Sequence, residues 1–471
     1  MWLKDKTRLG PFALLAAALI LGGTLRFFRL GSAELTPDEA ASWAAAAAPT
    51  AAEVVRLQAK LNPGKLAVHD LALHAWIGIF GAGVTAMRAL SALLGTLQIV
   101  LVFWVAREIL LLGRRGQVPS TPDQEAAVDY PAAIGALIFA VNLAAIKYAR
   151  EARMYAVLMV MMLLQVGFLI RARTREGWLN YLAVALFTML SVAANFTAVF
   201  MIMTEGLWLL LTVNARRERV FWKLLGAVAL GIAGFIAITG AALHIGVATL
   251  ENGTLNFIPY PHLRDLVAFF NYGTLSYTLI VALAVWGIVA GWSAGRAAIV
   301  FALLWMWGPV ILLYIVSLTV TPLLVTRYAL SSFVPFLILA ALGIWYCGTA
   351  RAQAAALSLV IALAAIQFAS YIHRSPPMEW RRSVERIRAY SPSAVIAVAP
   401  VRGANLIRYY LSGADGYRVV GLTDRASCAG SGILVVWNGG IYGPFRKQAD
   451  DCSSAFPRVV YRDRDFQVLA R

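Results

Sequence analysis

Residues 88–111, RALSALLGTLQIVLVFWVAREILL, decide the class of fold. The stretch is apolar through its middle, and its charged residues stand only near its two ends. A helix of about 20 apolar residues crosses the hydrocarbon core of a bilayer, because each residue rises about 1.5 Å. The stretch therefore predicts a membrane-spanning helix.

The composition extends this prediction to the whole chain. Of the 471 residues, 60% are hydrophobic and only 14% are charged, which is too little polar surface for a water-soluble protein of this length. The formal net charge of +17 raises the question of nucleic acid. The basic residues adjoin apolar runs, however, where they set topology and meet lipid headgroups. We expect a polytopic protein that contacts membrane lipids and no nucleic acid.

Eleven apolar runs are long enough, or nearly long enough, to cross a bilayer. Internal Gly and Pro are compatible with such helices, because neighbouring helices satisfy the freed backbone groups. The predicted spans are 11–29, 88–111, 131–147, 154–170, 178–194, 196–212, 223–245, 272–291, 297–317, 328–347 and 352–371.

The distribution of Lys and Arg orients these spans. Three basic residues precede the first run and no small-residue cleavage site follows it, so we predict an uncleaved span with a cytoplasmic N-terminus. Eleven spans then leave the C-terminus outside. In this orientation the inside connections carry most of the cations, including Arg114, Arg115, Arg171, Arg173, Arg175, Arg216, Arg217 and Arg219.

Two outer segments are too long to be turns. Residues 31–87 form a first outer loop, in which 66–81 (LAVHDLALHAWIGIFG) predicts a helix lying in the membrane interface. Residues 373–471 are richer in charge and alternate short apolar runs with polar stretches. We therefore predict a transmembrane domain over 1–372, which includes the loop, and a small α/β domain over 373–471 with a helix at 379–390 and strands at 394–399 and 432–437.

The cysteines agree with an outer C-terminal domain. Cys428 and Cys452 both lie in it, whereas Cys347 lies in an apolar span. An oxidising compartment favours a Cys428–Cys452 disulfide, and the alternative is two unpaired small residues. No CxxC or HExxH pattern indicates a metal site.

Four outer segments concentrate charge beside the membrane, where charge is costly and usually functional. Carboxylates together with several cations suggest a site for a phosphate-bearing substrate with a carboxylate as base. The segments hold, in order, Glu34, Asp38 and Glu39; Lys65, His69, Asp70 and His74; Lys147, Arg150, Glu151, Arg153 and Tyr155; and Arg327 with Tyr328.

Three of the four segments also have a purely structural interpretation. Thr36 followed by Glu39 has the spacing of a capping box at a helix start. In the second segment, Lys65 could extend to lipid headgroups, and His69 and His74 could be ordinary interfacial histidines. In the third segment, Arg150 could pair with Glu151.

The order of motifs over about 25–350 resembles a known enzyme family. The motifs are PDEA (37–40), LALHAW (71–76), GIFGAGVTAMRALSALLGTLQIVLVFWVARE (78–108), YAREARMYAVLMVMMLL (148–164) and TRYALSSFVPFLILAALGI (326–344). They look like the polyprenyl-phosphate-sugar glycosyltransferases of the C-type (GT-C) fold. The nearest resemblance is to bacterial family 39/83-like enzymes related to protein O-mannosyltransferases and to lipid A aminoarabinose transferase.

The resemblance implies transfer of a hexosyl or pentosyl group from undecaprenyl or decaprenyl phosphate. The acceptor would be a lipid, glycan or protein at the outer face of the bacterial inner membrane, with the C-terminal domain periplasmic. In that family the first-loop acidic residue is commonly assigned as catalytic base, and Asp38 matches it with Glu39 beside it.

The resemblance also implies which cations meet the donor phosphate. Lys65 aligns with the cation of a His-Pro-Pro or Lys-Pro-Pro motif, although Leu66 and Ala67 stand here in place of the prolines. Arg150 and Arg153 fall in the family's arginine segment. We expect further substrate contacts from His69, Glu151, Tyr155 and Tyr328.

The chemistry is also reasonable without the family. Lys65, Arg150, Arg153 and Arg327 would stabilise the charge of a departing polyprenyl phosphate. Asp38 would accept the acceptor's proton, which suits direct displacement with inversion. Glu39 keeps a covalent route open, and Asp38 with Glu39 could hold Mg²⁺ or Mn²⁺, although the pattern requires no metal.

Other functions remain as alternatives. A transporter or flippase of lipid-linked sugars would usually show inverted repeats and charges at mid-membrane, whereas here the charges gather at the outer ends of spans. A scaffold built around the C-terminal domain leaves the charged segments unexplained. A polymerase or ligase of surface glycans is a third alternative.

Overall fold

The structure is a computed structural model that falls into two compact units. The first comprises Met1–Phe28, Pro63–His69 and Arg88–Ile372, and the second comprises Arg29–Asn62, Asp70–Met87 and His373–Arg471. The sequence assigns the first outer loop to the transmembrane part, but by contacts most of the loop groups with the C-terminal residues. The residues that the structure describes are 9–62, 65–113, 122–212, 219–240, 258–271, 274–374, 380–422, 428–438, 444–463 and 465–471.

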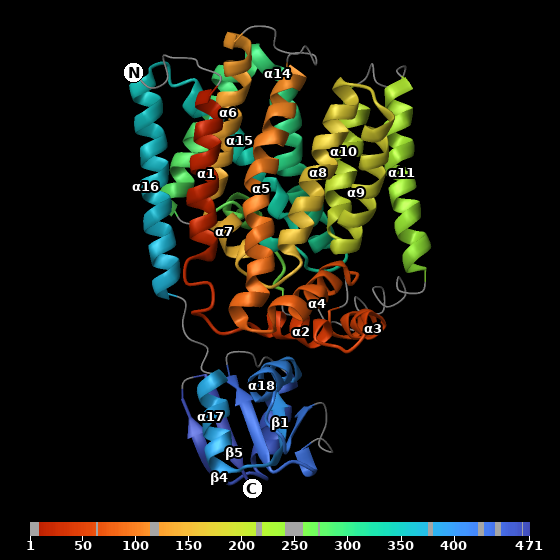
Figure 1. Cartoon of the computed structure of the whole chain (residues 1–471), viewed down its shortest axis with the longest axis vertical. Coiled ribbons are helices and arrows are strands. Elements are labelled where there is room, and N and C mark those ends of the chain that lie inside the picture. Colours follow the sequence, from red (N-terminus) through yellow and green to blue (C-terminus); the bar gives the residue numbers. More distant parts are fainter. Residues whose placement is uncertain are drawn as a thin grey trace. The chain divides into compact units, whose positions relative to one another are not determined.

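The first unit is a bundle of long helices (Figure 1). α15 is almost completely buried among its neighbours, whereas α1 and α16 expose many apolar side chains, as expected of helices that face lipid. The elements are α1 (Leu9–Phe27), α5 (Val84–Gly113), α6 (Pro122–Val141), α7 (Leu143–Ala149), α8 (Tyr155–Thr174), α9 (Trp178–Ala194), α10 (Ala198–Leu211), α11 (Arg219–Thr239), α13 (Leu263–Ala268), α14 (Thr274–Thr319), η2 (Thr326–Ser332), α15 (Phe333–Trp345) and α16 (Ala350–Arg374).

These helices confirm the predicted polytopic architecture. Within the described residues, eight helices are long and apolar enough to cross a membrane, and a bent pair, Ala127–Val141 with Leu143–Ala149, makes up to nine. The shorter apolar helices Trp178–Ala194 and Ala198–Leu211 coincide with two further predicted spans. α14 contains two of the eight, because its backbone leaves helical geometry at Gly295.

A few of the predictions fall on residues that the structure does not describe. Two predicted spans are affected, at residues 241–245 and 272–273. Seven cations that the sequence predicts to be inside also lie outside the described residues, namely Lys4, Lys6, Arg8, Arg114, Arg115, Arg216 and Arg217.

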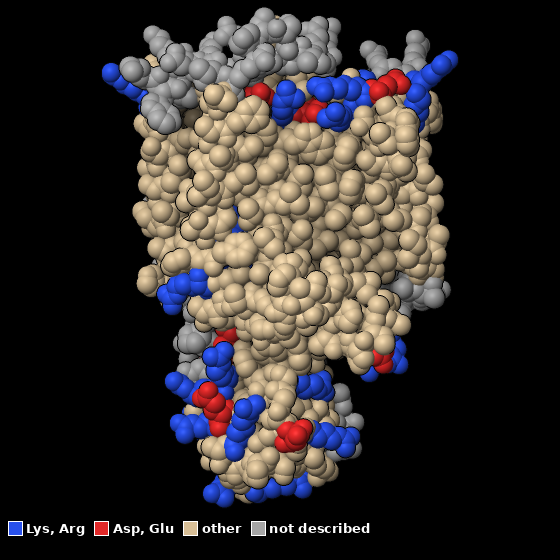
Figure 2. Space-filling view, in the orientation of Figure 1, with Lys and Arg blue, Asp and Glu red and all other residues tan. Residues whose placement is uncertain are grey.

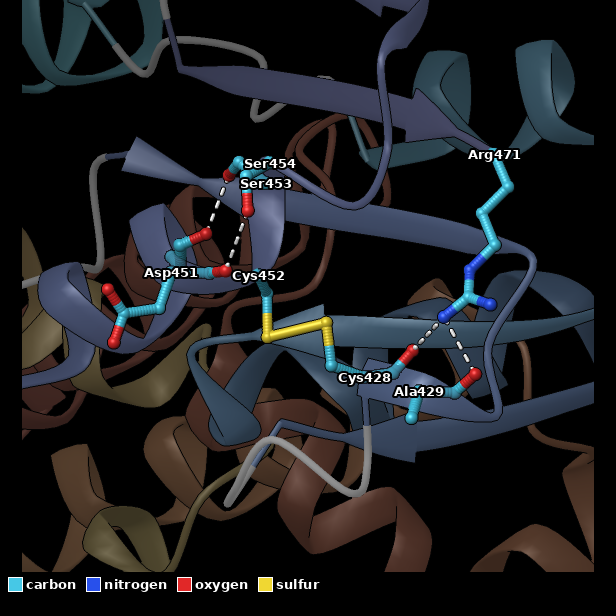
Figure 3. The surroundings of a disulfide bond; sticks show 8 residues. Cys428, Ala429, Asp451, Cys452, Ser453, Ser454 and Arg471 are labelled. Carbon is cyan, nitrogen blue, oxygen red and sulfur yellow. Dashed lines mark hydrogen bonds between the residues drawn. A yellow bond between two sulfur atoms is a disulfide. The ribbon is translucent and has the colours of Figure 1, made fainter.

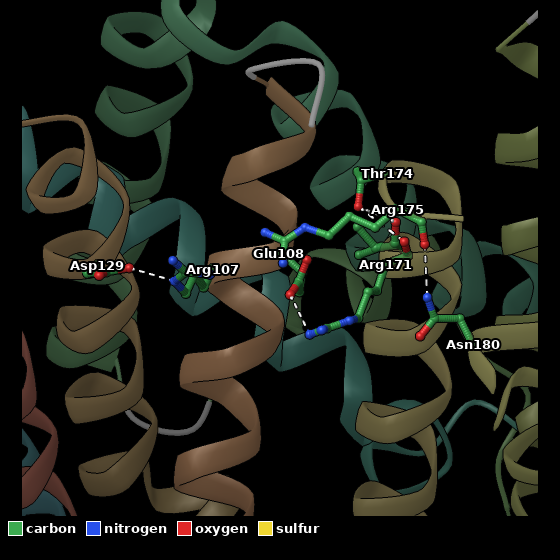
Figure 4. Close-up of polar contacts among 8 residues, drawn as sticks. Arg107, Glu108, Asp129, Arg171, Thr174, Arg175 and Asn180 are labelled. Carbon is green, nitrogen blue, oxygen red and sulfur yellow. Dashed lines mark hydrogen bonds and ion pairs between the residues drawn. The ribbon is translucent and has the colours of Figure 1, made fainter. Parts of the chain in front are cut away.

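On the face of this bundle that Figure 2 shows, a broad band has almost no charged side chains, and Lys, Arg, Asp and Glu side chains border it at one end. Opposite charges pair between helix ends that the sequence predicts to be inside (Figure 4). Such pairing lowers the cost of placing charge beside an apolar layer. The pairs are Arg107 with Asp129 at 2.8 Å, Arg171 with Glu108 at 3.5 Å and Lys223 with Glu176 at 2.9 Å.

A buried arginine supports the break between α6 and α7, which bend by 60°. Arg26 of α1 is 0% exposed, and its Nη1 donates to the carbonyls of Gly22 and Ala140, both at 2.9 Å. Asn142 caps α7 by accepting the Ala145 N–H at 3.1 Å. Because a bilayer offers no water to a broken helix, these protein groups satisfy the backbone at the bend.

The second unit contains a five-stranded mixed sheet in the order β2-β1-β3-β5-β4. β1 pairs in parallel with β2 and β3, whereas β5 pairs antiparallel with β3 and β4. The strands are β1 (Ala394–Ala399), β2 (Tyr417–Gly421), β3 (Ile433–Trp437), β4 (Arg458–Arg462) and β5 (Phe466–Ala470). The predicted strand at 394–399 is confirmed to the residue, and the one at 432–437 begins one residue later.

Helices α17 (Trp380–Tyr390), η3 (Val401–Gly403), α18 (Ala404–Leu411) and α20 (Pro444–Ser453) accompany the sheet, which completes the predicted α/β domain. A disulfide joins Cys428 to Cys452 of α20, and both residues are buried in the core with Leu434 and Phe456 (Figure 3). The Arg471 side chain donates to the Cys428 carbonyl at 3.1 Å. Cys347 is a free thiol.

The first outer loop folds as three helices, α2 (Pro37–Ala46), α3 (Ala51–Leu61) and α4 (Val68–Phe80). α4 confirms the helix predicted within 66–81, whereas α3 was not predicted. Its start is marked by Thr50, whose side chain accepts the Glu53 N–H at 3.3 Å. A Thr three residues before a Glu is the signal that the sequence offered for this helix.

Candidate active site

The two neighbouring carboxylates of α2 have different surroundings. Glu39 is 1% exposed, and its Oε2 accepts the Thr36 N–H at 2.9 Å. In return the Glu39 N–H donates to Thr36 Oγ1 at 3.2 Å, so the predicted capping box is confirmed. Asp38 is exposed. Of this pair, Asp38 is therefore the more exposed carboxylate.

Joint coordination of one divalent ion by this pair stays a prediction. Consecutive residues of a helix point about 100° apart, and one Glu39 oxygen already serves the capping box. Within the described residues, no group of three or more His, Cys, Asp or Glu side chains could hold a metal. We assign no step to a metal.

The third acidic residue of the first segment, Glu34, caps a helix of the C-terminal domain. Its carboxylate accepts the N–H groups of Trp380 at 2.8 Å and Arg381 at 3.0 Å, at the start of α17. Next to it, the Leu35 N–H donates to Tyr410 Oη at 3.3 Å. Burial, assisted by the negative charge of Glu34, raises the pKa of Tyr410 to about 12. From the sequence Glu34 has no assigned role, because its partners lie 346 residues away.

The polar residues of α4 are enclosed by protein. His69 is 1% exposed and Asp70 is 0% exposed. His74 lies further along the helix, and its Nδ1 is 2.8 Å from the Ala46 carbonyl oxygen at the end of α2. This hydrogen bond joins α4 to α2, so His74 has a structural role in the first outer loop.

The cations of the candidate site belong to the first unit. Lys65 is 4% exposed. The backbone fixes its position, because the N–H of Leu66 donates to the Ala193 carbonyl at 2.8 Å, near the C-terminal end of α9. A lysine so enclosed is not one that extends to lipid headgroups, which was its structural alternative.

Arg150 and Arg153 lie in the turn between α7 and α8, and both are buried. Arg150 Nη1 donates to the carbonyls at the end of α1, namely Leu25 at 3.0 Å, Arg26 at 3.1 Å and Phe28 at 2.7 Å. A cation at a helix C-terminus satisfies orphan carbonyls and opposes the helix dipole. One guanidinium nitrogen of Arg150 therefore holds α1 in place, and burial lowers the pKa of this group.

Arg88 is a residue of this region that sequence reasoning missed. It lies in α5, is 5% exposed, and is close enough to Arg150 for their charges to interact. Tyr371 of α16 hydrogen-bonds to Arg150. Two buried guanidinium groups that repel each other favour an anion between or beside them. The sequence did offer a signal, because a cation at the predicted outer end of a span runs against the usual charge distribution.

Arg327 and Tyr328 are partly buried in η2. This short helix packs against α7 and α8, and the Arg327 guanidinium lies 5.5 Å from the centre of the Tyr328 ring. Tyr155, 3% exposed, begins α8, and its ring contacts that of Tyr148. Glu151 is partly buried in the α7–α8 turn, where its carbonyl accepts the Arg153 N–H at 2.7 Å.

The structure thus brings the predicted cations to connected elements of one unit. α7 contacts α8 and η2, and α8 packs against α9, whose last turn holds the segment of Lys65. Lys147 lies on α7, with its ammonium 5.2 Å from the centre of the Tyr148 ring. Asp38 and Glu39 belong to the other unit.

No family model and no curated protein matches the sequence. Solved structures do match. The chain is similar to ArnT from Cupriavidus metallidurans bound to undecaprenyl phosphate, at 15% identity over 98% of both chains with a TM-score of 0.63. The apo state of that enzyme matches at 14% identity over 98% of this chain and 97% of the other, with a TM-score of 0.62.

A more distant likeness is to the apo oligosaccharyltransferase of Archaeoglobus fulgidus, at 11% identity over 92% of this chain and 70% of that one, with a TM-score of 0.56. Both neighbours are membrane enzymes of the GT-C fold. The resemblance found in the sequence motifs is thereby confirmed at the level of the fold: this chain is a multi-pass membrane protein with the GT-C architecture of ArnT.

Proposed function

We propose that the protein is a membrane glycosyltransferase that moves a sugar from a polyprenyl phosphate to an acceptor. The observation that carries the proposal is the match to ArnT over 98% of both chains, since that enzyme was solved with undecaprenyl phosphate bound. A fold alone hosts many activities. The buried cations of the first unit therefore supply the independent support.

The donor phosphate is assigned to Lys65 and Arg153, with Arg88 as an added contact. All three are nearly buried, with exposures of 4%, 6% and 5%. Buried cations attract a phosphate more strongly than solvated ones, because the local dielectric is low. Arg150, whose Nη1 donates to the end of α1, and Arg327 of η2 are assigned as further phosphate contacts.

Asp38 is assigned as general base. The acceptor hydroxyl gives its proton to the carboxylate, the resulting oxygen attacks the anomeric carbon, and the polyprenyl phosphate leaves with the electrons of the broken bond. The cations stabilise the charge that collects on the departing phosphate. A single exposed carboxylate on α2 favours direct displacement, and therefore inversion, over a covalent intermediate.

We further propose that the protein resides in a bacterial inner membrane, with a cytoplasmic N-terminus and a periplasmic C-terminal domain. The helix bundle has a charged border at one end (Figure 2), and a border that contains Lys and Arg suits the cytoplasmic side. A buried disulfide in the C-terminal domain suits the periplasm.

The test is reconstitution in proteoliposomes with a panel of radiolabelled undecaprenyl-phosphate sugars and an envelope extract as acceptor. Transfer of label to acceptor, lost in Asp38→Asn, supports the proposal. Movement of the labelled lipid across the bilayer without any transfer would instead identify a flippase. A product with retained anomeric configuration would overturn direct displacement.

A further inference from the structure

We infer that the C-terminal domain is part of the transferase machinery, because through Glu34 it positions the helix that carries Asp38. The inference rests on the proposed function, in which Asp38 is the base. It assigns to Glu34 the role of a positioning residue that never meets substrate.

The first contact is the cap on α17. Glu34 stands four residues before Asp38, and both of its carboxylate oxygens accept α17 N–H groups, from Trp380 at 2.8 Å and Arg381 at 3.0 Å. A carboxylate at a helix N-terminus makes charge-assisted bonds and is further favoured by the helix dipole. The chain entering α2 is therefore fastened to the C-terminal domain.

The second contact is between α2 and α18. The rings of Trp43 on α2 and Tyr409 on α18 meet edge to face, with centres 5.1 Å apart. Tyr409 Oη donates to the Ala82 carbonyl at 3.1 Å, and Tyr410 Oη accepts the Leu35 N–H. Tyr410 therefore contacts the residue that precedes α2 by two positions. Tyr409 contacts both the Trp43 side chain of α2 and the segment that follows α4.

The helix needs such support. α2 has only 10 residues, and isolated helices of that length are marginal in water. The capping box at Thr36 shapes its first turn but does not fix where the helix lies. Because a displacement of about 1 Å in a catalytic group can cost on the order of 100-fold in rate, the contacts to α17 and α18 are expected to govern turnover.

The experiment uses the full-length protein in detergent or nanodiscs. In Glu34→Ala, we expect kcat to fall about 10- to 100-fold while KM for the donor stays within about twofold. Hydrogen exchange should accelerate over residues 35–46. Glu34→Gln keeps a side-chain acceptor and should recover part of the loss. Glu385→Ala is the matched control, because this exposed glutamate lies on the same helix α17 without a place in the contact.

A second pair of variants covers the case in which Glu34→Ala does not fold. Tyr409→Ala removes the ring contact with Trp43, whereas Tyr409→Phe keeps it, so the alanine variant should lose turnover and the phenylalanine variant should recover most of it. Unchanged kcat in folded Glu34→Ala or Tyr409→Ala would overturn the inference, as would unchanged exchange over α2.

The outcome can be separated from that of the proposed function. If Asp38→Asn still transfers sugar while Glu34→Ala loosens α2, the base assignment fails and so does the catalytic part of the inference, but the structural coupling stands. If Asp38→Asn is inactive and Glu34→Ala retains full kcat, only the inference fails.

Discussion

Asp38 and Glu39 are consecutive residues of one helix, yet Asp38 is exposed and Glu39 is 1% exposed with its carboxylate bonded to the Thr36 N–H. The capping box thus uses the buried acid to fix the first turn of α2, whereas the other acid is exposed. For this segment the sequence left a structural role and a catalytic role as alternatives. In the proposed function, Glu39 has the structural role and Asp38 has the catalytic role.

This division predicts different outcomes for two isosteric substitutions. Asp38→Asn should lower transfer at least about 100-fold, because the acceptor proton loses its base. Glu39→Gln should stay near the parent rate, since glutamine also serves in a capping box. Steady-state transfer assays on both variants check this. A dead Glu39→Gln enzyme with intact α2 would mean that Glu39 acts chemically.

The buried cations predict a change in donor use. Arg88→Met and Lys65→Met should each raise donor KM about tenfold, which corresponds to roughly 1.4 kcal/mol of lost binding. Lys60→Met is the control, because Lys60 is an exposed cation on α3 outside the proposed phosphate region. Titration with undecaprenyl phosphate, followed by thermal shift, measures the affinity. Equal affinity in Arg88→Met would remove Arg88 from the phosphate contacts.

The raised pKa of Tyr410 predicts alkaline sensitivity of the second unit. The folded phenol holds its proton up to about pH 12, whereas an unfolded tyrosine releases it near pH 10. The stability contributed by this group is therefore constant below about pH 10 and falls as the pH rises towards 12. Unfolding followed by tryptophan fluorescence across this range tests the prediction. Tyr410→Phe should flatten this part of the profile, and Tyr390→Phe should leave it unchanged.

The disulfide predicts a redox-dependent stability. Removing a cross-link between residues 24 apart costs about 3.5 kcal/mol by the chain-entropy estimate. Cys428→Ser/Cys452→Ser, or treatment of the parent with dithiothreitol, should lower the melting temperature of the C-terminal domain to a similar extent. Mass spectrometry of the unreduced protein provides the control. Free thiols at both positions would show that the disulfide does not form, and the predicted loss of stability would then not occur.

Arg26 predicts a purely structural defect. Arg26→Met leaves the Ala140 carbonyl without its 2.9 Å donor at the α6–α7 bend, and an unsatisfied buried carbonyl costs about 1–3 kcal/mol. Thermal unfolding in detergent should show the loss, and donor KM should be unchanged in the fraction that folds. A large rise in donor KM at normal stability would instead point to a role in binding.

The membrane architecture was well predicted, because spans are set by local apolar length. Each of the eleven predicted spans corresponds to a helix, or to the bent pair, in the structure. The helix beginning at residue 380 and the strand at 394–399 were predicted equally well. Both follow from the spacing of apolar residues and from composition, which are local properties of the sequence. The capping box at Thr36 was another local signal, and it was confirmed.

What the sequence could not supply were contacts between distant segments. Arg150 reads as a phosphate ligand, but its bonds to Leu25 and Phe28 depend on how α7 meets α1. In the sequence, Glu34 is one of three neighbouring acidic residues, and it has no assigned role. Its partners in α17 could not be predicted, because they are distant along the chain. In the sequence, Arg88 is only the first residue of a predicted span. Its interaction with the charge of Arg150 becomes visible only in the structure.

The bond between Glu34 and α17 also has a consequence for biosynthesis. The two partners are 346 residues apart, and ribosomes add about 5–20 residues per second, so roughly 20 to 70 seconds separate their synthesis. During that interval α2 lacks its contacts with α17 and α18. If turnover depends on those contacts, a nascent chain that is already inserted in the bilayer stays inactive until its C-terminal domain has been exported and folded.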